Sequence, residues 1–298
     1  MVAEKNAPSL ASTHWDKRYE EDKRSAWFSN NLVLSELNRR ITGADKFWMA
    51  WLFDEFLDFK PKKILSIGCG DGAHELVIGR NKWADSVDAF DISPAGISMA
   101  AETARRENLN VNFYVDSFDS FIAAPASAKY DVVMFVGSLH HVKELEGMLG
   151  KVRDCLTPNG VLIVNEYCGP CYNIYEPSRI AIINGILDAL DPTFKLRPDS
   201  RWENAALETI LDIDPSESVR SALIPVFIRY YFDTCMERQF GGAILHPIFD
   251  HLNSVRLNDG SVESVSIVRM LIEIENRLQA SGAIPNDFLL GVYQHKTQ

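Results

Sequence analysis

Residues 64–72, ILSIGCGDG, constrain the fold most, because an apolar run leads directly into three glycines at alternate positions, Gly68, Gly70 and Gly72. Glycine turns a chain sharply at positive φ, and its missing Cβ leaves main-chain N–H groups open to a ligand. In α/β proteins, a strand that ends in such a turn brings a nucleotide-like ligand against bare backbone. The segment therefore predicts a buried strand, a tight turn and a binding site for such a ligand.

An acidic residue follows the glycine turn at the distance that a ribose-binding site requires. Asp91 ends the next β-rich run and lies about 20 residues beyond the glycines, where a carboxylate can accept hydrogen bonds from both ribose hydroxyls. Asp88 is its competitor, but Asp88 lies inside the strand pattern. The spacing G-x-G-x-G also lacks the third glycine of the dinucleotide fingerprint G-x-G-x-x-G, which disfavours NAD.

Charge and hydropathy exclude several classes of partner. The 298 residues include 30 Lys and Arg but 41 Asp and Glu, a net charge of −11 without a dense basic block, so we expect no nucleic-acid partner. The longest apolar stretch, residues 132–139, is much shorter than a transmembrane helix, and residues 1–5 lack the apolar core of a signal peptide. We therefore expect a cytoplasmic protein without a membrane partner.

Two of the five cysteines, Cys168 and Cys171, have the spacing of a redox motif. Such a motif normally places its first thiol at a helix N-terminus, and the residues that follow here, which include Asn173 and Pro177, start a helix poorly. A redox role is therefore disfavoured.

The rest of the chain divides into parts with different periodicities. Residues 12–59 are expected to be helical, because aromatic and leucine side chains recur at helical spacing. From residue 61 onward, β-rich runs alternate with helical segments, which predicts a parallel sheet with right-handed crossovers. The expected strands are 63–67, 86–91, 111–115, 130–136 and 160–166, and the expected helices between them are near 72–82, 94–108 and 142–156. Beyond residue 166 we expect helices near 177–190, 203–212, 216–236 and 262–280, with strands at 254–257 and 288–294.

The chain resembles the class I S-adenosylmethionine-dependent methyltransferases over residues 60–166 and over the closing helix and strand. Besides the glycine turn and Asp91, the resemblance rests on segments 114–118 (YVDSF), 129–133 (KYDVV), 137–141 (GSLHH) and 156–162 (LTPNGVL). It implies a Rossmann-like α/β fold with a seven-stranded sheet, N-terminal helices and a helical insert after strand five. The sixth strand and the antiparallel seventh strand would come from residues 254–257 and 288–294.

The resemblance also implies a single methyltransferase domain over residues 1–298 that binds S-adenosylmethionine and releases S-adenosylhomocysteine. It would comprise an N-terminal helical cap (1–59), a cofactor-binding core (60–167), a helical insert that covers the substrate (168–253) and closing strands and helix (254–298). The residues expected to bind the cofactor are Gly68, Cys69, Gly70, Gly72, Asp91, Ile92, Asp116, Ser117, Phe118, Gly137 and Ser138. Ser66 departs from the family pattern, because many relatives carry Asp or Glu there to order the methionine end of the cofactor. Asp71 or Glu75 could compensate.

Methyl transfer is an in-line displacement, so the protein mainly has to hold the nucleophile near the methyl carbon. A hydroxyl must also lose its proton, and a histidine is the obvious general base. His140 and His141 follow strand four at the carboxyl edge of the sheet, and Glu166 ends strand five at the same edge. We predict these three as catalytic residues, although structural packing stays open for each. The predicted reaction is methylation of a hydroxyl on a small molecule, such as a sugar or a secondary metabolite.

Other functions stay open beside this one. A small amine would need no strong base, so N-methylation is the first alternative, followed by an NAD-dependent oxidoreductase and by a cofactor-binding protein without catalysis. A metal ion on His140, His141 and Glu144 is conceivable, but no H-E-x-x-H pattern supports it, and we predict no metal site. The identity of the acceptor stays open as well, and a homodimer is compatible with the sequence.

Overall fold

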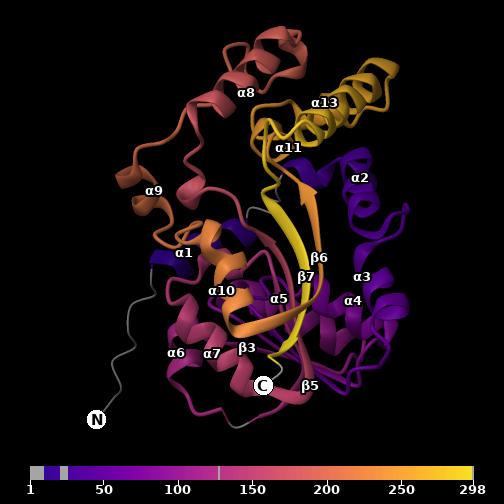
Figure 1. The fold of residues 1–298 in the computed structure, drawn as a ribbon, viewed down its shortest axis with the longest axis vertical. Helices are drawn as coiled ribbons and strands as arrows, with labels where there is room; N and C mark the ends of the chain where they lie inside the picture. The colour runs from indigo at the N-terminus through magenta and orange to yellow at the C-terminus, as the bar shows by residue number, and fades with distance from the viewer. Residues whose placement is uncertain (1–9, 21–25, 127, 297–298) are drawn as a thin grey trace.

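A seven-stranded mixed sheet forms the centre of the molecule (Figure 1). The computed structural model describes residues 10–20, 26–126 and 128–296. The spatial order of the strands is β3-β2-β1-β4-β5-β7-β6, and β7 runs antiparallel to both of its neighbours, whereas the other neighbouring strands pair in parallel. The expected fold class, a Rossmann-like α/β sheet with an antiparallel seventh strand, is confirmed. The strands are β1 (Lys63–Ile67), β2 (Ser86–Asp91), β3 (Val111–Val115), β4 (Tyr130–Val136), β5 (Leu156–Tyr167), β6 (Phe232–Gly241) and β7 (Phe288–His295).

Helices connect the parallel strands as the alternation predicted. The period of two in β1 distributes its apolar side chains over both faces of the sheet. Ile64 belongs to the apolar cluster that includes α2 and α13, whereas Leu65 and Ile67 belong to the cluster that includes α7 and α10. Both faces of the sheet are therefore covered, as a parallel sheet requires. The helices named here and those that follow β1 to β4 are α2 (Asn31–Thr42), α4 (Ala73–Asn81), α5 (Pro94–Arg106), α6 (Phe118–Ala123), α7 (Leu145–Cys155), α10 (Ile224–Tyr231) and α13 (Val262–Ala280).

The segments before β1 and after β5 are helical, as expected. Before β1 the chain forms α1 (Leu10–Glu20), α2 and α3 (Trp48–Trp51), and after β5 it forms α8 (Pro177–Ala189), α9 (Leu207–Ile213) and α10. Figure 1 shows α8 and α13 beyond the carboxyl ends of β5 and β6, at the top of the view. Within the described residues, no helix combines the length and the apolar character that crossing a bilayer needs.

Two predicted elements are wrong. Residues 254–257 form a short helix, α12 (Ser254–Leu257), because the side chain of Asn253 accepts a hydrogen bond from Arg256 N and so caps a helical turn. The sixth strand is instead β6, which takes up the end of the expected helix 216–236, so that the α-helix α10 ends at Tyr231. No Gly or Pro separates residues 232–236 from the apolar helical segment before them, so the expected helix continues through them. The charged residues of β6, such as Glu237, are typical of an edge strand, and within the described residues β6 pairs with β7 alone. The insert between β5 and α11 (Leu245–Phe249) therefore contains a strand.

We use Gly72 and Gly282 as a matched pair to test how tightly the glycine turn is packed. Both have positive φ, +72° and +74°, but a Cβ on Gly72 would lie 2.6 Å from ring atoms of Phe113, whereas nothing lies within 4 Å at Gly282. Alanine costs about 1–2 kcal/mol in either left-handed position. We expect Gly72→Ala to lose about 1–3 kcal/mol more, because it overfills a packed core. Urea unfolding of the two variants measures this difference, and equal losses would contradict the close approach at Gly72.

Candidate functional site

A cavity of about 610 Å³ opens at the carboxyl ends of β1, β2, β3 and β4. This is the edge at which open α/β sheets bind their ligands, and the volume suits a ligand of nucleotide size. Gly72 does not line the cavity, and a Cβ at this position would meet the ring of Phe113 instead. The structure therefore brings together all but one of the residues predicted to bind the cofactor, although their contact with it stays a prediction. The residues from that set that line the cavity are Gly68, Cys69, Gly70, Asp91, Ile92, Asp116, Ser117, Phe118, Gly137 and Ser138.

The carboxylate of Asp91 is fixed at the wall of this cavity by the backbone around it. Its Oδ2 accepts a hydrogen bond from Gly70 N at 2.9 Å, and its Oδ1 accepts one from Ser93 N at 2.9 Å. Burial raises the pKa of Asp91, and these two hydrogen bonds oppose that shift. Each carboxylate oxygen has a second lone pair, so Asp91 can still accept hydrogen bonds from a ligand.

Asp88, the competitor of Asp91, lies away from the cavity. Its carboxylate forms an ion pair with Lys63 at 2.8 Å and accepts hydrogen bonds from Tyr130 OH at 3.1 Å and from Asn112 Nδ2 at 3.2 Å. Asp88 is therefore committed to contacts within the sheet, as its position inside the strand pattern suggested.

Glu75, from α4, lies beside Ser66 of β1. Ser66 Oγ donates a hydrogen bond of 2.6 Å to Glu75 Oε1, and Glu75 is almost completely buried. Burial raises the pKa of Glu75 to about 7, more than this hydrogen bond lowers it. Glu75 does not line the cavity, whereas Asp71 does. Of the two residues that could compensate for Ser66, Asp71 therefore has access to a ligand.

Helix α1 closes the cavity from the side of β2, a contact that the sequence did not reveal. Asp16 accepts hydrogen bonds from Ser93 Oγ at 2.5 Å and from Ala95 N at 3.1 Å, at the start of α5. Ala11 and Trp15, from the same helix, line the cavity. The apolar spacing of α1 predicts a helix, but it does not predict this contact, because Asp16 and its partners lie more than 70 residues apart in the sequence.

Glu166 holds the loop after β4 in place. The side chain is 1% exposed, and its Oε1 accepts hydrogen bonds from the backbone N–H groups of Ser138 and Leu139, both at 2.5 Å. Its Oε2 lies 2.7 Å from His140 Nδ1. Burial alone would lower the pKa of His140, but the adjacent carboxylate outweighs it and raises that pKa above its ordinary value. Neither His140 nor Glu166 lines the cavity, whereas His141 does.

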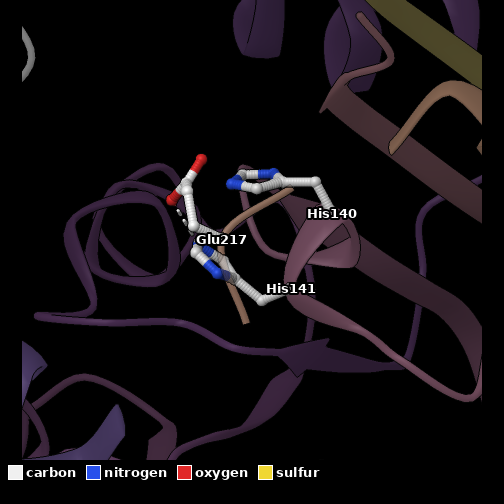
Figure 2. A group of neighbouring side chains, drawn as sticks. All are labelled: His140, His141 and Glu217. Atoms are coloured by element: carbon white, nitrogen blue, oxygen red, sulfur yellow. Dashed lines mark ion pairs between the residues drawn. The ribbon is translucent and has the colours of Figure 1, made fainter. Parts of the chain in front are cut away.

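His141 and His140 meet a glutamate that sequence reasoning missed (Figure 2). Glu217 lies between α9 and α10, and its Oε2 is 3.9 Å from His141 Nε2. The other ring nitrogen of His141, Nδ1, lies 3.1 Å from Ser216 Oγ. Burial and the neighbouring imidazole lower the pKa of His141. Burial would raise the pKa of Glu217, but His141, His140 and two hydrogen bonds lower it to about 2.

His246 and Cys168 lie outside this group. Burial lowers the pKa of His246 to about 4, and its ring packs against Trp27 and Tyr167, with centroids 5.6 Å away in each case. Burial raises the pKa of the Cys168 thiol well above its usual range. A reactive redox cysteine needs the opposite shift, which agrees with the prediction against redox chemistry.

Comparisons with known proteins agree with this geometry. The methyltransferase domain family matches residues 42–237 of the chain. A demethylmenaquinone methyltransferase from Thermus thermophilus is 24% identical over 172 residues, which cover 55% of this chain and 77% of that protein. A mitochondrial ubiquinone biosynthesis O-methyltransferase from Schizosaccharomyces pombe is 29% identical over 156 residues, 52% of this chain and about half (51%) of that protein. The solved structure of the PH0226 protein from Pyrococcus horikoshii OT3 aligns over 82% of this chain and 86% of that one, with 17% identity and a TM-score of 0.45.

We expect Glu75 to make the protein less stable as the pH rises. Its pKa is about 7 in the folded protein against 4.5 ordinarily, so the folded state holds a proton that the unfolded chain releases. The contribution of Glu75 to the free energy of unfolding is therefore greatest below pH 4.5 and is lost as the pH rises through about 7. This loss amounts to about 3 kcal/mol. Glu75→Gln removes the ionisation and keeps the shape. Its stability relative to the native protein should increase from pH 5 to pH 8 in urea unfolding, and a constant difference would contradict the shift.

Proposed function

The chain belongs to the methyltransferase domain family and uses S-adenosylmethionine as its methyl donor, and from this premise we propose that it methylates a hydroxyl oxygen of a small molecule. The observation that carries the proposal is the 2.7 Å contact between His140 Nδ1 and Glu166 Oε2. It leaves the other ring nitrogen of His140, Nε2, as the atom that can take up the acceptor's proton. Because the chain belongs to a methyltransferase family, we no longer consider the alternative of an NAD-dependent oxidoreductase.

We assign the donor to the cavity at the carboxyl edge of the sheet. Asp91 would accept hydrogen bonds from the ribose hydroxyls through the lone pairs that Gly70 N and Ser93 N leave available. The resemblance to the class I methyltransferases implies that residues 116–118 would contact the adenine and that Gly137 and Ser138 would lie beneath the sulfonium. The support for this assignment is that Asp91, residues 116–118, Gly137 and Ser138 all line the cavity.

The chemistry needs little covalent help from the protein. The acceptor oxygen attacks the methyl carbon in line, and the sulfonium leaves as a neutral thioether, so the site has to align the two and remove one proton. His140 would accept that proton at Nε2, and the carboxylate of Glu166 would stabilise the imidazolium that forms. Glu166 thus serves as a positioning residue, while His141 would contact the acceptor from the cavity wall.

The insert supplies the other wall of the proposed acceptor site. Ser216 lines the donor cavity, and both Ser216 and Glu217 lie against His141. We therefore propose that residues 168–253 work with the core as one catalytic unit and select the acceptor. Relatives named as O-methyltransferases of ubiquinone biosynthesis favour an oxygen acceptor over a small amine, which stays the second candidate.

His140→Ala tests the general base. With labelled S-adenosylmethionine and a panel of monosaccharide and phenolic acceptors, we expect turnover to fall about 10²–10⁴-fold, because proton removal in the transition state is lost. Calorimetric affinity for S-adenosylhomocysteine should stay the same. His295→Ala, at the end of β7, where Nε2 of the ring lies 3.1 Å from Thr157 O, is the matched control and should keep native turnover. Native rates in His140→Ala, or transfer to amine members of the panel alone, would contradict the proposal.

Asp91→Ala tests the donor site. We expect the affinity for S-adenosylhomocysteine to fall by about 1.5–3 kcal/mol, the range for hydrogen bonds to a charged group. Asp88→Ala removes a carboxylate from the same strand. Because Asp88 contacts neighbouring strands and does not line the cavity, we expect the affinity for S-adenosylhomocysteine to stay unchanged. Isothermal calorimetry compares the two variants, and equal effects would exclude a specific role for Asp91.

A further inference from the structure

We propose that His140, His141 and Glu217 form a binding site for a divalent transition-metal ion. One potential ligand atom from each residue lies within 4.8 Å of the other two (Figure 2). The two histidines come from the loop after β4, and Glu217 comes from the insert after β5. Two imidazoles and a carboxylate are a donor set suited to Zn²⁺, Fe²⁺, Mn²⁺ or Co²⁺, whereas Ca²⁺ and Mg²⁺ prefer oxygen ligands alone.

Each of the three side chains is oriented by a partner on its far side. His140 Nδ1 is 2.7 Å from Glu166, so Nε2 is its available atom, and His141 Nδ1 is 3.1 Å from Ser216 Oγ, which leaves Nε2 toward Glu217. Glu217 Oε1 accepts hydrogen bonds from Asn173 Nδ2 at 2.9 Å and from Ser218 Oγ at 2.6 Å, which leaves Oε2. Ligands of protein metal sites are held by outer hydrogen bonds of this kind.

The backbone around Glu217 is strained in a way that serves this arrangement. Tyr172, Asn173 and Ser218 adopt positive φ of 58°, 55° and 49°. Asn173 and Ser218 both donate to Glu217, and Tyr172 N donates to Ser218 O at 2.9 Å. Left-handed backbone costs about 1–2 kcal/mol per residue, and such strain concentrates at ligand clamps and active sites.

Electrostatics also favour a cation at this place. The carboxyl groups of Glu166, Asp214 and Glu217 lie around the two imidazoles, at 2.7 Å from His140 Nδ1, 3.6 Å from His141 Nδ1 and 3.9 Å from His141 Nε2. Asp214 Oδ2 is 3.6 Å from His141 Nδ1 and, within the described residues, has no hydrogen-bond partner. A buried carboxylate oxygen without a donor is costly, and a nearby divalent ion offsets that cost.

The three ligand atoms have to move closer together when a metal binds. Zinc lies about 2.0–2.1 Å from a histidine nitrogen, which places tetrahedral ligands roughly 3.3 Å apart. His141 Nε2 and Glu217 Oε2, now 3.9 Å apart, therefore have to approach by about 0.6 Å, and the other pairs, which lie within 4.8 Å, by at most about 1.5 Å. Glu144, the third ligand considered from the sequence, is exposed, and Glu217 takes its place.

The metal and the proton of the acceptor would compete for the same atom, Nε2 of His140. We therefore expect occupancy of the site to lower turnover in the proposed O-methylation. Metal binding itself is independent of the proposed reaction, because it is measured without an acceptor. Turnover that rises with metal would support the site and overturn the assignment of His140 as the base.

Titration of the chelator-treated full chain with Zn²⁺ and with Co²⁺ tests the proposal. We expect one equivalent to bind with micromolar affinity or tighter, and Co²⁺ to show the visible absorption of a four- or five-coordinate ion without thiolate charge transfer. Glu217→Gln, which keeps the side-chain shape, and His141→Ala should each weaken binding by about tenfold or more. Glu144→Gln is the matched control and should bind like the native protein.

The cysteines supply the alternative explanation, because Cys168 and Cys171 are free thiols and zinc binds thiolates well. Cys168→Ser should leave binding unchanged. Three results would overturn the site. The first is loss of metal binding in Cys168→Ser, and the second is native binding in both Glu217→Gln and His141→Ala. The third is that the native protein binds no metal at concentrations about 100-fold above the expected micromolar dissociation constant. Circular dichroism of each variant shows that the fold is retained, and Glu217→Gln remains decisive if His141→Ala does not fold.

Discussion

The buried carboxylate of Glu166 is the interaction on which the site depends. A charged group that is 1% exposed is tolerated only when donors surround it, and here two backbone N–H groups and a histidine ring do so. These contacts tie the end of β5 to the loop after β4. The same loop carries Ser138 on the cavity wall and both histidines, so one side chain sets the position of this part of the cavity wall and that of the proposed base.

A second constraint is the close approach of the glycine turn to that loop. A Cβ at Gly68 would lie 2.6 Å from Ser138 Cβ, so the turn after β1 and the loop after β4 are in contact only because Gly68 has no side chain. Asp91 completes the arrangement from β2 by holding Gly70 N. The loops after β1, β2 and β4 therefore hold one another in place, and together with the loop after β3 they line the cavity.

Elements with a strong local signal could be predicted from the sequence, and contacts between distant segments could not. The glycine turn, Asp91 and the strands up to β5 follow from periodicity and turn residues within short windows. The start of β6, residues 232–236, was mistaken for the end of a helix because no Gly or Pro separates it from α10. α12 was mistaken for a strand because a single cap residue, Asn253, decides so short a segment. Asp16 and Glu217 were missed for another reason. Their partners lie in distant parts of the chain, and no spacing rule links an acidic residue in a loop to a histidine after another strand.

The placement of β7 has a consequence for how the chain matures during synthesis. β7 lies between β5 and β6, and within the described residues β6 has no other strand neighbour. While residues 288–295 are still inside the ribosome, β6 therefore has no strand to pair with and one edge of β5 is open. The loops after β1 to β4, which line most of the cavity, are synthesised earlier. We therefore expect the parallel part of the sheet to form first and the pairing of β6 to depend on the late arrival of β7.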